Sequence, residues 1–278
     1  MSVQPAPDRP APPAGNAREP AFPGWAMGPF QVDYEARVDF ESLRRKRWQR
    51  VWQAMERAQL DGLLLWKDEN VRYVTGHRPQ LIAGKSGLLN GCLVTPGEPP
   101  LLFSSGGDAD RAASRMPWLA AVAAIPILEE AGLIEHFATR ILAPQLAARG
   151  LERGRVGIDL AAFRLVEALQ VHFPGVRWVD GDGAMQAARR IKLPEEVLLM
   201  EEAAAIAEAV TAAAVRAVAV GRRENEVAAE AMAELYRLGG EYAHVVTPFV
   251  ASGEHMSPPT RLSTDKVIRY GDLVFIDI

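Results

Sequence analysis

Cysteine is almost absent from the sequence, since Cys92 is the only one among 278 residues. An intramolecular disulfide is therefore excluded, and a reducing cytoplasm is the expected compartment. Cys92 lies in the apolar run Leu89-Asn-Gly-Cys-Leu-Val-Thr95, which is typical of a strand. We therefore interpret it as a small buried thiol rather than as a nucleophile.

Long apolar runs and an excess of positive charge are missing as well. No stretch approaches the roughly eighteen consecutive apolar residues that a membrane-spanning helix needs, so no membrane partner is expected. The first 24 residues contain seven prolines and lack the apolar core of a secretory signal. The net charge of −4 and the pI of about 5.8 argue against the basic surface of nucleic-acid-binding proteins.

One basic cluster occurs nonetheless, at the start of the first expected helix, and consists of Arg44, Arg45, Lys46, Arg47 and Arg50. It has two interpretations, a patch that binds anions or nucleic acid and a solvated helix face. Because the protein is acidic overall, we favour the solvated face and expect no nucleic-acid partner.

Composition divides the chain into three parts. Residues 1–34 form a leader rich in proline and alanine, which cannot bury enough apolar surface to offset the ordering of its backbone. We expect this leader to be disordered. The remainder, in a chain with 49% hydrophobic and 24% charged residues, is typical of a globular protein. The run Ile191-Lys-Leu-Pro194 places the boundary between two domains, 35–190 and 191–278.

Helices and strands alternate in residues 35–190. Apolar residues recur at helical spacing from Phe40 to Ala58, and the apolar run Gly62–Trp66 predicts a buried strand. Further strands are expected at 91–95, 100–104, 155–159 and 176–179, and further helices at 111–115, 134–148 and 161–173. This alternation predicts an α/β domain with a substantially parallel sheet. The glycine-rich segments 104–107 and 181–183 lack the spacing of phosphate-binding or dinucleotide-binding motifs, so we interpret them as turns.

Residues 191–278 begin with a long amphipathic pattern. Pro194 suits the first turn of a helix, because the backbone N–H groups of that turn have no acceptor within the helix and proline lacks this group. An apolar stripe that repeats every three or four residues extends this helix to Val220. A second helix is expected at 225–238, followed by a strand at 243–250.

The last residues of the chain predict a turn and a strand. Gly271-Asp272 is typical of a tight turn, and Leu273–Ile278 is apolar except for Asp277. An ionised carboxylate inside a buried strand costs several kcal/mol unless a cation or hydrogen-bond donors compensate it. Asp277 is therefore a candidate metal ligand.

Three segments resemble one enzyme family. Asp68-Glu-Asn-Val-Arg-Tyr-Val-Thr-Gly76 carries an N-x-R-Y-x-T-G pattern, and Lys192-Leu-Pro-Glu-Glu196 precedes the long alanine-rich helix. Val250–Glu254 and Asp265–Asp277 are similar to the stretch that leads to a first metal-binding aspartate. Together these segments resemble the creatinase, prolidase and aminopeptidase P family of metallohydrolases. The resemblance implies a homodimer in which a creatinase-type N-terminal α/β domain precedes the first half of a pita-bread α+β catalytic domain.

The same resemblance implies a metal-dependent chemistry. Enzymes of this family use two divalent ions, Mn, Co, Zn or Fe, to activate water for attack on an amide bond. Asp277 would be the first carboxylate ligand. In the family a second Asp, a His and two Glu follow at positions that this chain does not include, so we expect the 278-residue chain to be inactive.

The hairpin before Asp277 departs from the family pattern. Where the family has a His that contacts substrate or handles protons, this sequence has Thr260. A hydroxyl group cannot act as a base near neutral pH. His255 is the candidate replacement, with a merely solvated surface histidine as the other interpretation. His244 is a candidate for lining the same cleft, or equally a core histidine.

Three kinds of function stay open at this point. The first is a hydrolase that resembles Xaa-Pro aminopeptidases or dipeptidases and takes short peptides. The second is a creatinase-like C–N hydrolase or a dimethylsulfoniopropionate-lyase-like enzyme with a small-molecule substrate, which would leave an Xaa-Pro dipeptide uncut. The third is a metal-free binding module, which would hold no metal after dialysis.

Overall fold

The computed structural model describes residues 37–78, 88–240, 248–259 and 261–278. The chain divides into two compact units, Met1–Ile191 and Lys192–Ile278, and each is described by itself. Throughout the described ranges, no helix is both long enough and apolar enough to cross a membrane.

The first unit contains a six-stranded sheet in the order β4-β3-β2-β1-β5-β6. The strands are β1 (Gly62–Leu65), β2 (Asn90–Val94), β3 (Leu101–Ser105), β4 (Ala121–Ile125), β5 (Arg155–Ile158) and β6 (Arg177–Asp180). The sheet is substantially parallel, as expected, but β2 runs antiparallel to both β1 and β3. The short connection between β2 and β3 accounts for their antiparallel pairing, since parallel neighbours need a longer crossover connection. The other three pairings are parallel.

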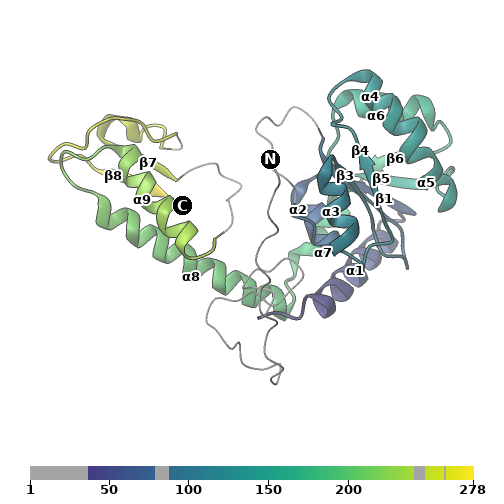
Figure 1. The fold of residues 1–278 in the computed structure, drawn as a ribbon, viewed down its shortest axis with the longest axis horizontal. Coiled ribbons are helices and arrows are strands. Elements are labelled where there is room, and N and C mark those ends of the chain that lie inside the picture. The colour runs from purple at the N-terminus through teal and green to yellow at the C-terminus, as the bar shows by residue number, and fades with distance from the viewer. Residues whose placement is uncertain (1–36, 79–87, 241–247, 260) are drawn as a thin grey trace, which may run out of the picture. The chain divides into compact units, whose positions relative to one another are not determined.

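Helices cover both faces of this sheet (Figure 1). One face carries α1 (Phe40–Arg57), α2 (Asp68–Thr75), α3 (Gly107–Arg115) and α7 (Asp182–Arg190). The other carries α4 (Ala131–His136), the π-helical turn η2 (Phe137–Leu142), α5 (Ala143–Ala148) and α6 (Phe163–His172). Successive residues of β1 point to opposite faces, so Leu63 and Leu65 join the first core and Leu64 joins the second.

Three elements of this unit, α2, β4 and α7, are absent from the sequence-based expectation. Strand β4 is rich in alanine and half-exposed at the edge of the sheet, so it lacks the continuous apolar run of a central strand. Helix α7 begins at Asp182, which lies between two glycines, and the interpretation of 181–183 as a turn is wrong for its second half. Helix α7 packs Ala184, Met185 and Ala188 into the first core.

The N-x-R-Y-x-T-G segment forms α2 and its cap. The Asn70 side chain donates to Asp159 Oδ2 at 2.9 Å and accepts from Arg189 at 2.6 Å, so it connects α2 with the end of β5 and with α7. Thr75 Oγ1 donates to the Val71 carbonyl oxygen at 2.6 Å. Gly76 ends the helix with a φ of 76°, a left-handed conformation that favours glycine. This motif therefore connects three elements of the first unit, α2, the end of β5 and α7.

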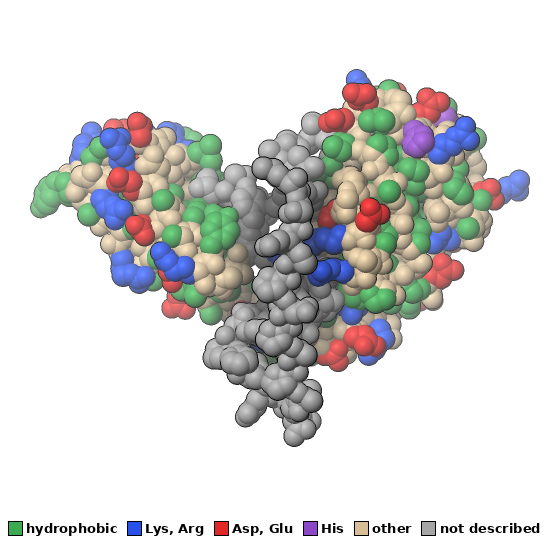
Figure 2. Space-filling view, in the orientation of Figure 1, with side chains coloured by type: hydrophobic (Ala, Val, Ile, Leu, Met, Phe, Trp, Pro, Cys, Tyr) green, Lys and Arg blue, Asp and Glu red, His purple; other side chains and the backbone are tan. Residues whose placement is uncertain are grey.

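The arginines of the basic cluster contact the protein's own surface. The guanidinium of Arg44 lies 3.8 Å from the centre of the Trp118 ring, and that of Arg47 lies 4.6 Å from the centre of Tyr73. Such cation–π contacts use the flat guanidinium for packing. Figure 2 shows basic and acidic side chains mixed over the visible face of each unit.

The second unit contains two helices and a two-stranded sheet. Its elements are α8 (Pro194–Ala217), α9 (Glu224–Arg237), β7 (Phe249–Ser252), the 3-10 helix η3 (Gly253–Met256) and β8 (Val274–Asp277). The predicted helices are confirmed, although α8 ends three residues before Val220. Residues 241–247, most of the expected strand 243–250, lie outside the described ranges, and the described strand starts at Phe249.

The core of this unit is small. Val210, Ala214 and Ala217 of α8 pack against Val227 and Ala231 of α9, together with Val250 of β7 and Ile268. The amphipathic stripe of α8 is thus buried only in its second half, and Ala203 in the first half is exposed. The helix itself begins as expected, with Pro194 in its first turn and the Glu196 carboxylate accepting from the Leu193 N–H group at 2.9 Å.

Candidate functional site

Asp277 is the last residue of β8, where it pairs with Phe249 of β7 in an antiparallel register. The expectation that this carboxylate lies in a buried strand is wrong, because the residue is exposed and β8 is only half-buried. Among the residues that the structure describes, this sheet has two strands, so β8 pairs only with β7. An exposed carboxylate loses little hydration, so its presence here does not by itself require a cation.

The described residues do not assemble a metal site around Asp277. No group of three or more His, Cys, Asp or Glu side chains in these ranges lies close enough to hold an ion. A divalent ion usually takes at least three protein ligands. Asp277 as a metal ligand therefore stays a prediction that depends on further donors.

His255 lies in η3, directly after β7, and is half-buried. Its Nδ1 atom lies 3.4 Å from Glu224 Oε2 and 3.5 Å from Thr264 Oγ1. A carboxylate beside Nδ1 favours the proton on that nitrogen, which leaves Nε2 as an acceptor. His255 is therefore held by a carboxylate and is more than a freely solvated surface histidine.

The structure does not bring His255 and Asp277 together. Asp277 pairs with Phe249 at one end of the β7–β8 ladder, and Val274 pairs with Ser252 at the other end, next to η3. Three residue steps separate the two ends, which is about 10 Å at the usual rise of a strand. Asp277 and η3, which carries His255, therefore lie at opposite ends of this ladder.

Thr260 and His244 lie outside the described residues. Ser263, three residues after Thr260 in the sequence, donates its hydroxyl to the Pro248 carbonyl oxygen at 3.1 Å and accepts from the Val250 N–H group at 3.0 Å. Val250 pairs with Ile276, the residue before Asp277. Ser263 therefore lies near the end of the ladder that carries Asp277.

A buried carboxylate organises the base of this hairpin. Glu224, the first residue of α9, has no exposed surface. It accepts hydrogen bonds from the Ser252 N–H and hydroxyl at 2.7 and 2.8 Å, and from the Thr264 N–H and hydroxyl at 3.2 and 2.8 Å. Burial opposes ionisation of Glu224, but the donors from Thr264 and Ser252 outweigh it and lower its pKa below the ordinary value. The ionised side chain ties the end of β7 to the segment after Thr260.

A second set of charges braces the other side of the hairpin. The ammonium of Lys266 donates to Asp272 Oδ2 at 2.8 Å and to Ser252 Oγ at 2.8 Å. The hydrogen bond from Lys266, followed by that from the Arg269 N–H group, lowers the pKa of Asp272 well below its usual range. Arg269 also pairs with Glu254 in η3. The predicted Gly271-Asp272 turn therefore also places the Asp272 carboxylate where it accepts hydrogen bonds from Lys266 and Arg269.

Gly253 lies between the Glu224 network and the Lys266–Asp272–Arg269 network, since it follows Ser252 and its Cα faces Asp272. Its φ of 52° lies in the left-handed region, and a Cβ atom there would meet Asp272 Oδ1 at 2.6 Å. Only glycine fits this position without displacing the Asp272 carboxylate.

Sequence reasoning missed Glu224, Ser252, Thr264 and Lys266. One signal was available, because a glutamate at the first position of a helix favours the positive end of the helix dipole. That signal describes a surface cap equally well. The burial of Glu224 depends on contacts with residues 28 and 40 positions away, which spacing alone does not give.

The first unit holds another buried polar cluster. His77 Nε2 lies 3.2 Å from Asn90 Oδ1 and 3.4 Å from Asp108 Oδ2, and the Ser104 hydroxyl donates to Asn90 Oδ1 at 2.8 Å. Burial is the main cause that lowers the pKa of His77, although Asp108 opposes it. A neutral, hydrogen-bonded histidine of this kind fits a polar core cluster that joins α2, β2, β3 and α3.

Comparison with protein families assigns most of the chain. Residues 47–191 match the creatinase/prolidase N-terminal domain, and residues 198–278 match metallopeptidase family M24. The Xaa-Pro dipeptidase of Pyrococcus horikoshii is 24% identical over 237 residues, which are 85% of this chain and 60% of that protein. The Xaa-Pro dipeptidase of Pyrococcus furiosus is 35% identical over 97 residues, 35% of this chain and 28% of that protein.

Solved structures share the fold. An Xaa-Pro dipeptidase from Bacillus anthracis superposes with a TM-score of 0.64 at 20% identity, over 84% of this chain and 60% of that one. A prolidase from Thermococcus sibiricus gives a TM-score of 0.66 at 18% identity, again over 84% and 60%. The chain thus spans about 60% of the length of these relatives.

Proposed function

Since the chain belongs to the creatinase/prolidase family, we propose that it acts in the metal-dependent hydrolysis of short peptides of the Xaa-Pro type. The observation that supports this proposal is the placement of Asp277. It ends a strand within the segment that matches the M24 metallopeptidases, and it presents a carboxylate that solvent can reach. Relatives of this chain in Pyrococcus are Xaa-Pro dipeptidases, which suggests the substrate class.

The described residues offer too few metal ligands to hold a divalent ion without further donors. Asp277 is one carboxylate, and the described residues add no cluster of donors beside it. We propose that Asp277 is the first ligand of a site for two divalent ions, Mn, Co, Zn or Fe, whose other ligands are not among the described residues. A metal ion in such a site would supply Lewis-acid chemistry, and Asp277 would contribute one negative charge to it.

The hairpin would supply the substrate side of the site. Ser263 lies beside β7 near the Asp277 end of the ladder, and this favours a substrate contact by Thr260. His244 is proposed as a second cleft residue. For His255, the Glu224 carboxylate at Nδ1 favours proton transfer through Nε2, whereas its place beyond the end of the β7–β8 ladder opposite to Asp277 opposes it.

The experiment uses the complete product of the coding sequence, read past codon 278. It compares the release of proline from an Xaa-Pro dipeptide with the cleavage of the matching Xaa-Ala dipeptide, in the presence of each metal and after chelation. Proline release that needs a divalent metal and is lost in Asp277→Asn would support the proposal. The control is Asp265→Asn, which removes an exposed aspartate. His255→Ala tests the proton-transfer role, since a base of the reaction would change the pH profile.

Three results would replace the proposal by another function. Conversion of creatine with an uncut dipeptide would indicate a creatinase-like C–N hydrolase. Cleavage of dimethylsulfoniopropionate would indicate a lyase. A complete product that retains no metal after dialysis and cleaves none of these compounds would be a binding module. The homodimer and the cytoplasmic location remain predictions, which gel filtration with light scattering and cell fractionation would check.

A further inference from the structure

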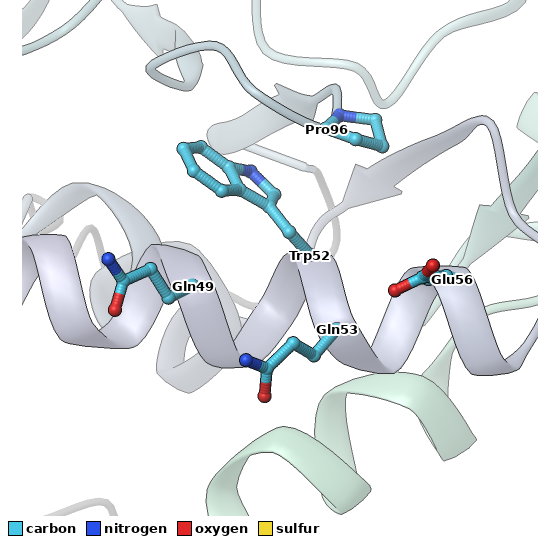
Figure 3. A pocket seen from close by; sticks show the side chains of 5 residues that line it. All are labelled: Gln49, Trp52, Gln53, Glu56 and Pro96. Atoms are coloured by element: carbon cyan, nitrogen blue, oxygen red, sulfur yellow. The ribbon is translucent and has the colours of Figure 1, made fainter.

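A hollow on the first unit lies outside the candidate functional site. Four residues of α1, namely Gln49, Trp52, Gln53 and Glu56, line it together with Pro96 from the turn after β2, and its volume is about 460 Å³. Figure 3 shows the Trp52 ring rising from α1 toward Pro96, with the two glutamines and Glu56 along the same stretch of helix. This spacing follows the helix period, which brings residues three and four apart onto one face.

The chemistry of the hollow fits an extended, proline-rich backbone. Trp52 and Pro96 offer apolar rings, Gln49 and Gln53 offer amide donors, and Glu56 offers a negative charge. A polyproline II segment has no internal hydrogen bonds, so its carbonyl groups are free to accept, and its proline rings pack on aromatic side chains.

The leader of this chain carries the sequence pattern of such a segment. The P-x-x-P pattern of polyproline II ligands occurs three times in the leader, at Pro7-Asp-Arg-Pro10, Pro10-Ala-Pro-Pro13 and Pro20-Ala-Phe-Pro23. Arg18 precedes the third copy by two residues and carries the charge opposite to that of Glu56. The third copy is also the nearest of the three to α1 along the sequence.

The connection between this segment and the hollow is long enough. Seventeen residue steps separate Pro23 from Phe40, the first residue of α1. Their maximal span is about 55 Å. Trp52 lies twelve residues into α1, which corresponds to about 18 Å along the helix. Because the segment is covalently attached, its effective concentration at the hollow is on the order of millimolar, so a weak contact suffices.

We propose that the hollow on α1 binds the Pro20–Pro23 segment of the same chain. The proline rings pack on Trp52 and Pro96, the glutamine amides donate to the carbonyls of the segment, and Arg18 pairs with Glu56. This intrachain contact is independent of the proposed hydrolase activity, because the residues of the hollow belong to the first unit.

The test places a nitroxide spin label on Asn16→Cys in the intact chain. Cys92 has no exposed surface, so the label reacts at the introduced cysteine. The chain has six tryptophans, and their indole N–H signals in a ¹⁵N spectrum are few enough to assign. The expected result is loss of the Trp52 signal and its return after reduction of the nitroxide. The Trp25 signal, nine residues from the label, must broaden in every sample and is the internal control.

Variants identify the contact. Replacing Pro20 and Pro23 by alanine should restore the Trp52 signal, and Glu56→Ala should restore it in part. Arg57→Ala, an exposed neighbour that does not line the hollow, should leave it broadened. An unaffected Trp52 signal in the labelled chain, or broadening that persists without the two prolines, would overturn the proposal. So would broadening that arises only when spin-labelled chain is mixed with unlabelled ¹⁵N chain, since a second copy would then fill the hollow.

Discussion

Replacing Glu224 by glutamine should destabilise the second unit and leave the first unaffected. Glu224 is buried and accepts from the Ser252 and Thr264 backbone N–H groups and from both hydroxyls. A glutamine of nearly the same shape keeps one carbonyl oxygen, but it turns an NH₂ group toward donors. The Thr264 hydroxyl can rotate and accept from that NH₂ group, whereas the Thr264 N–H group is left without an acceptor.

The size of the effect follows from these contacts. A hydrogen bond to a charged group contributes about 1.5–3 kcal/mol, and a buried donor left without an acceptor costs about 1–3 kcal/mol. We therefore expect Glu224→Gln to lower the free energy of unfolding of this unit by about 3 kcal/mol. For a unit of this size, each kcal/mol corresponds to a shift in Tm of roughly 4–8 °C. The expected decrease is therefore about 12–24 °C.

The positions of the tryptophans provide a selective assay. All six lie before residue 192, so tryptophan fluorescence follows the first unit only. Circular dichroism at 222 nm also follows α8 and α9. The variant should lower the midpoint of a transition seen by circular dichroism and leave the fluorescence midpoint unchanged. Glu230→Gln on the exposed side of α9 is the matched control, with an expected effect within about 0.5 kcal/mol. The reasoning is refuted if Glu224→Gln behaves like this control, or if both probes shift together.

Three further predictions use the same probes. Because the folded-state pKa of Glu224 is lowered from about 4.5, its contribution is complete above that pH and is lost as the pH falls through the lower folded value. Acid should therefore lower the circular dichroism midpoint more in the parent chain than in Glu224→Gln, and equal slopes would contradict this. Gly253→Ala should destabilise the second unit by about 1–3 kcal/mol, because the left-handed backbone and the Asp272 carboxylate both oppose a Cβ atom. If the circular dichroism midpoint does not change, the turn is more adaptable than its geometry indicates. Asn70→Ala should lower the fluorescence midpoint by an equivalent of about 2 kcal/mol, since it leaves Asp159 and Arg189 without their shared partner, and an unchanged midpoint would show that water replaces the amide.

Sequence patterns predicted the elements whose local signals agree with their packing. Helix α8 has a proline in its first turn and an apolar stripe, and its start is as expected. Strand β1 is four apolar or glycine residues buried on both faces. The missed strand β4 has alanines in place of large apolar residues, and it is specified by its pairing with β3 rather than by its own sequence. Local periodicity cannot supply that information.

The candidate site was less accessible to sequence reasoning. Asp277 was singled out by its chemistry, but its expected burial was wrong because strand character does not reveal how many strands flank it. The Glu224 network joins α9, β7 and the segment around Thr264, which are far apart in sequence. A pattern can identify a polar residue in an apolar context, but only the fold identifies which donors surround a charge.

The central position of β1 has a consequence for synthesis on the ribosome. Its partner β2 follows it closely, but its other neighbour, β5, pairs Val156 with Gly62, so 94 residues must follow before that edge is covered. At about 5–20 residues per second, the edge of Gly62–Leu65 stays unpaired for roughly 5–20 s. An apolar strand with open N–H and C=O groups is a template for pairing with other chains. Newly made molecules of this protein should therefore depend on chaperones until β5 has been synthesised and pairs with β1.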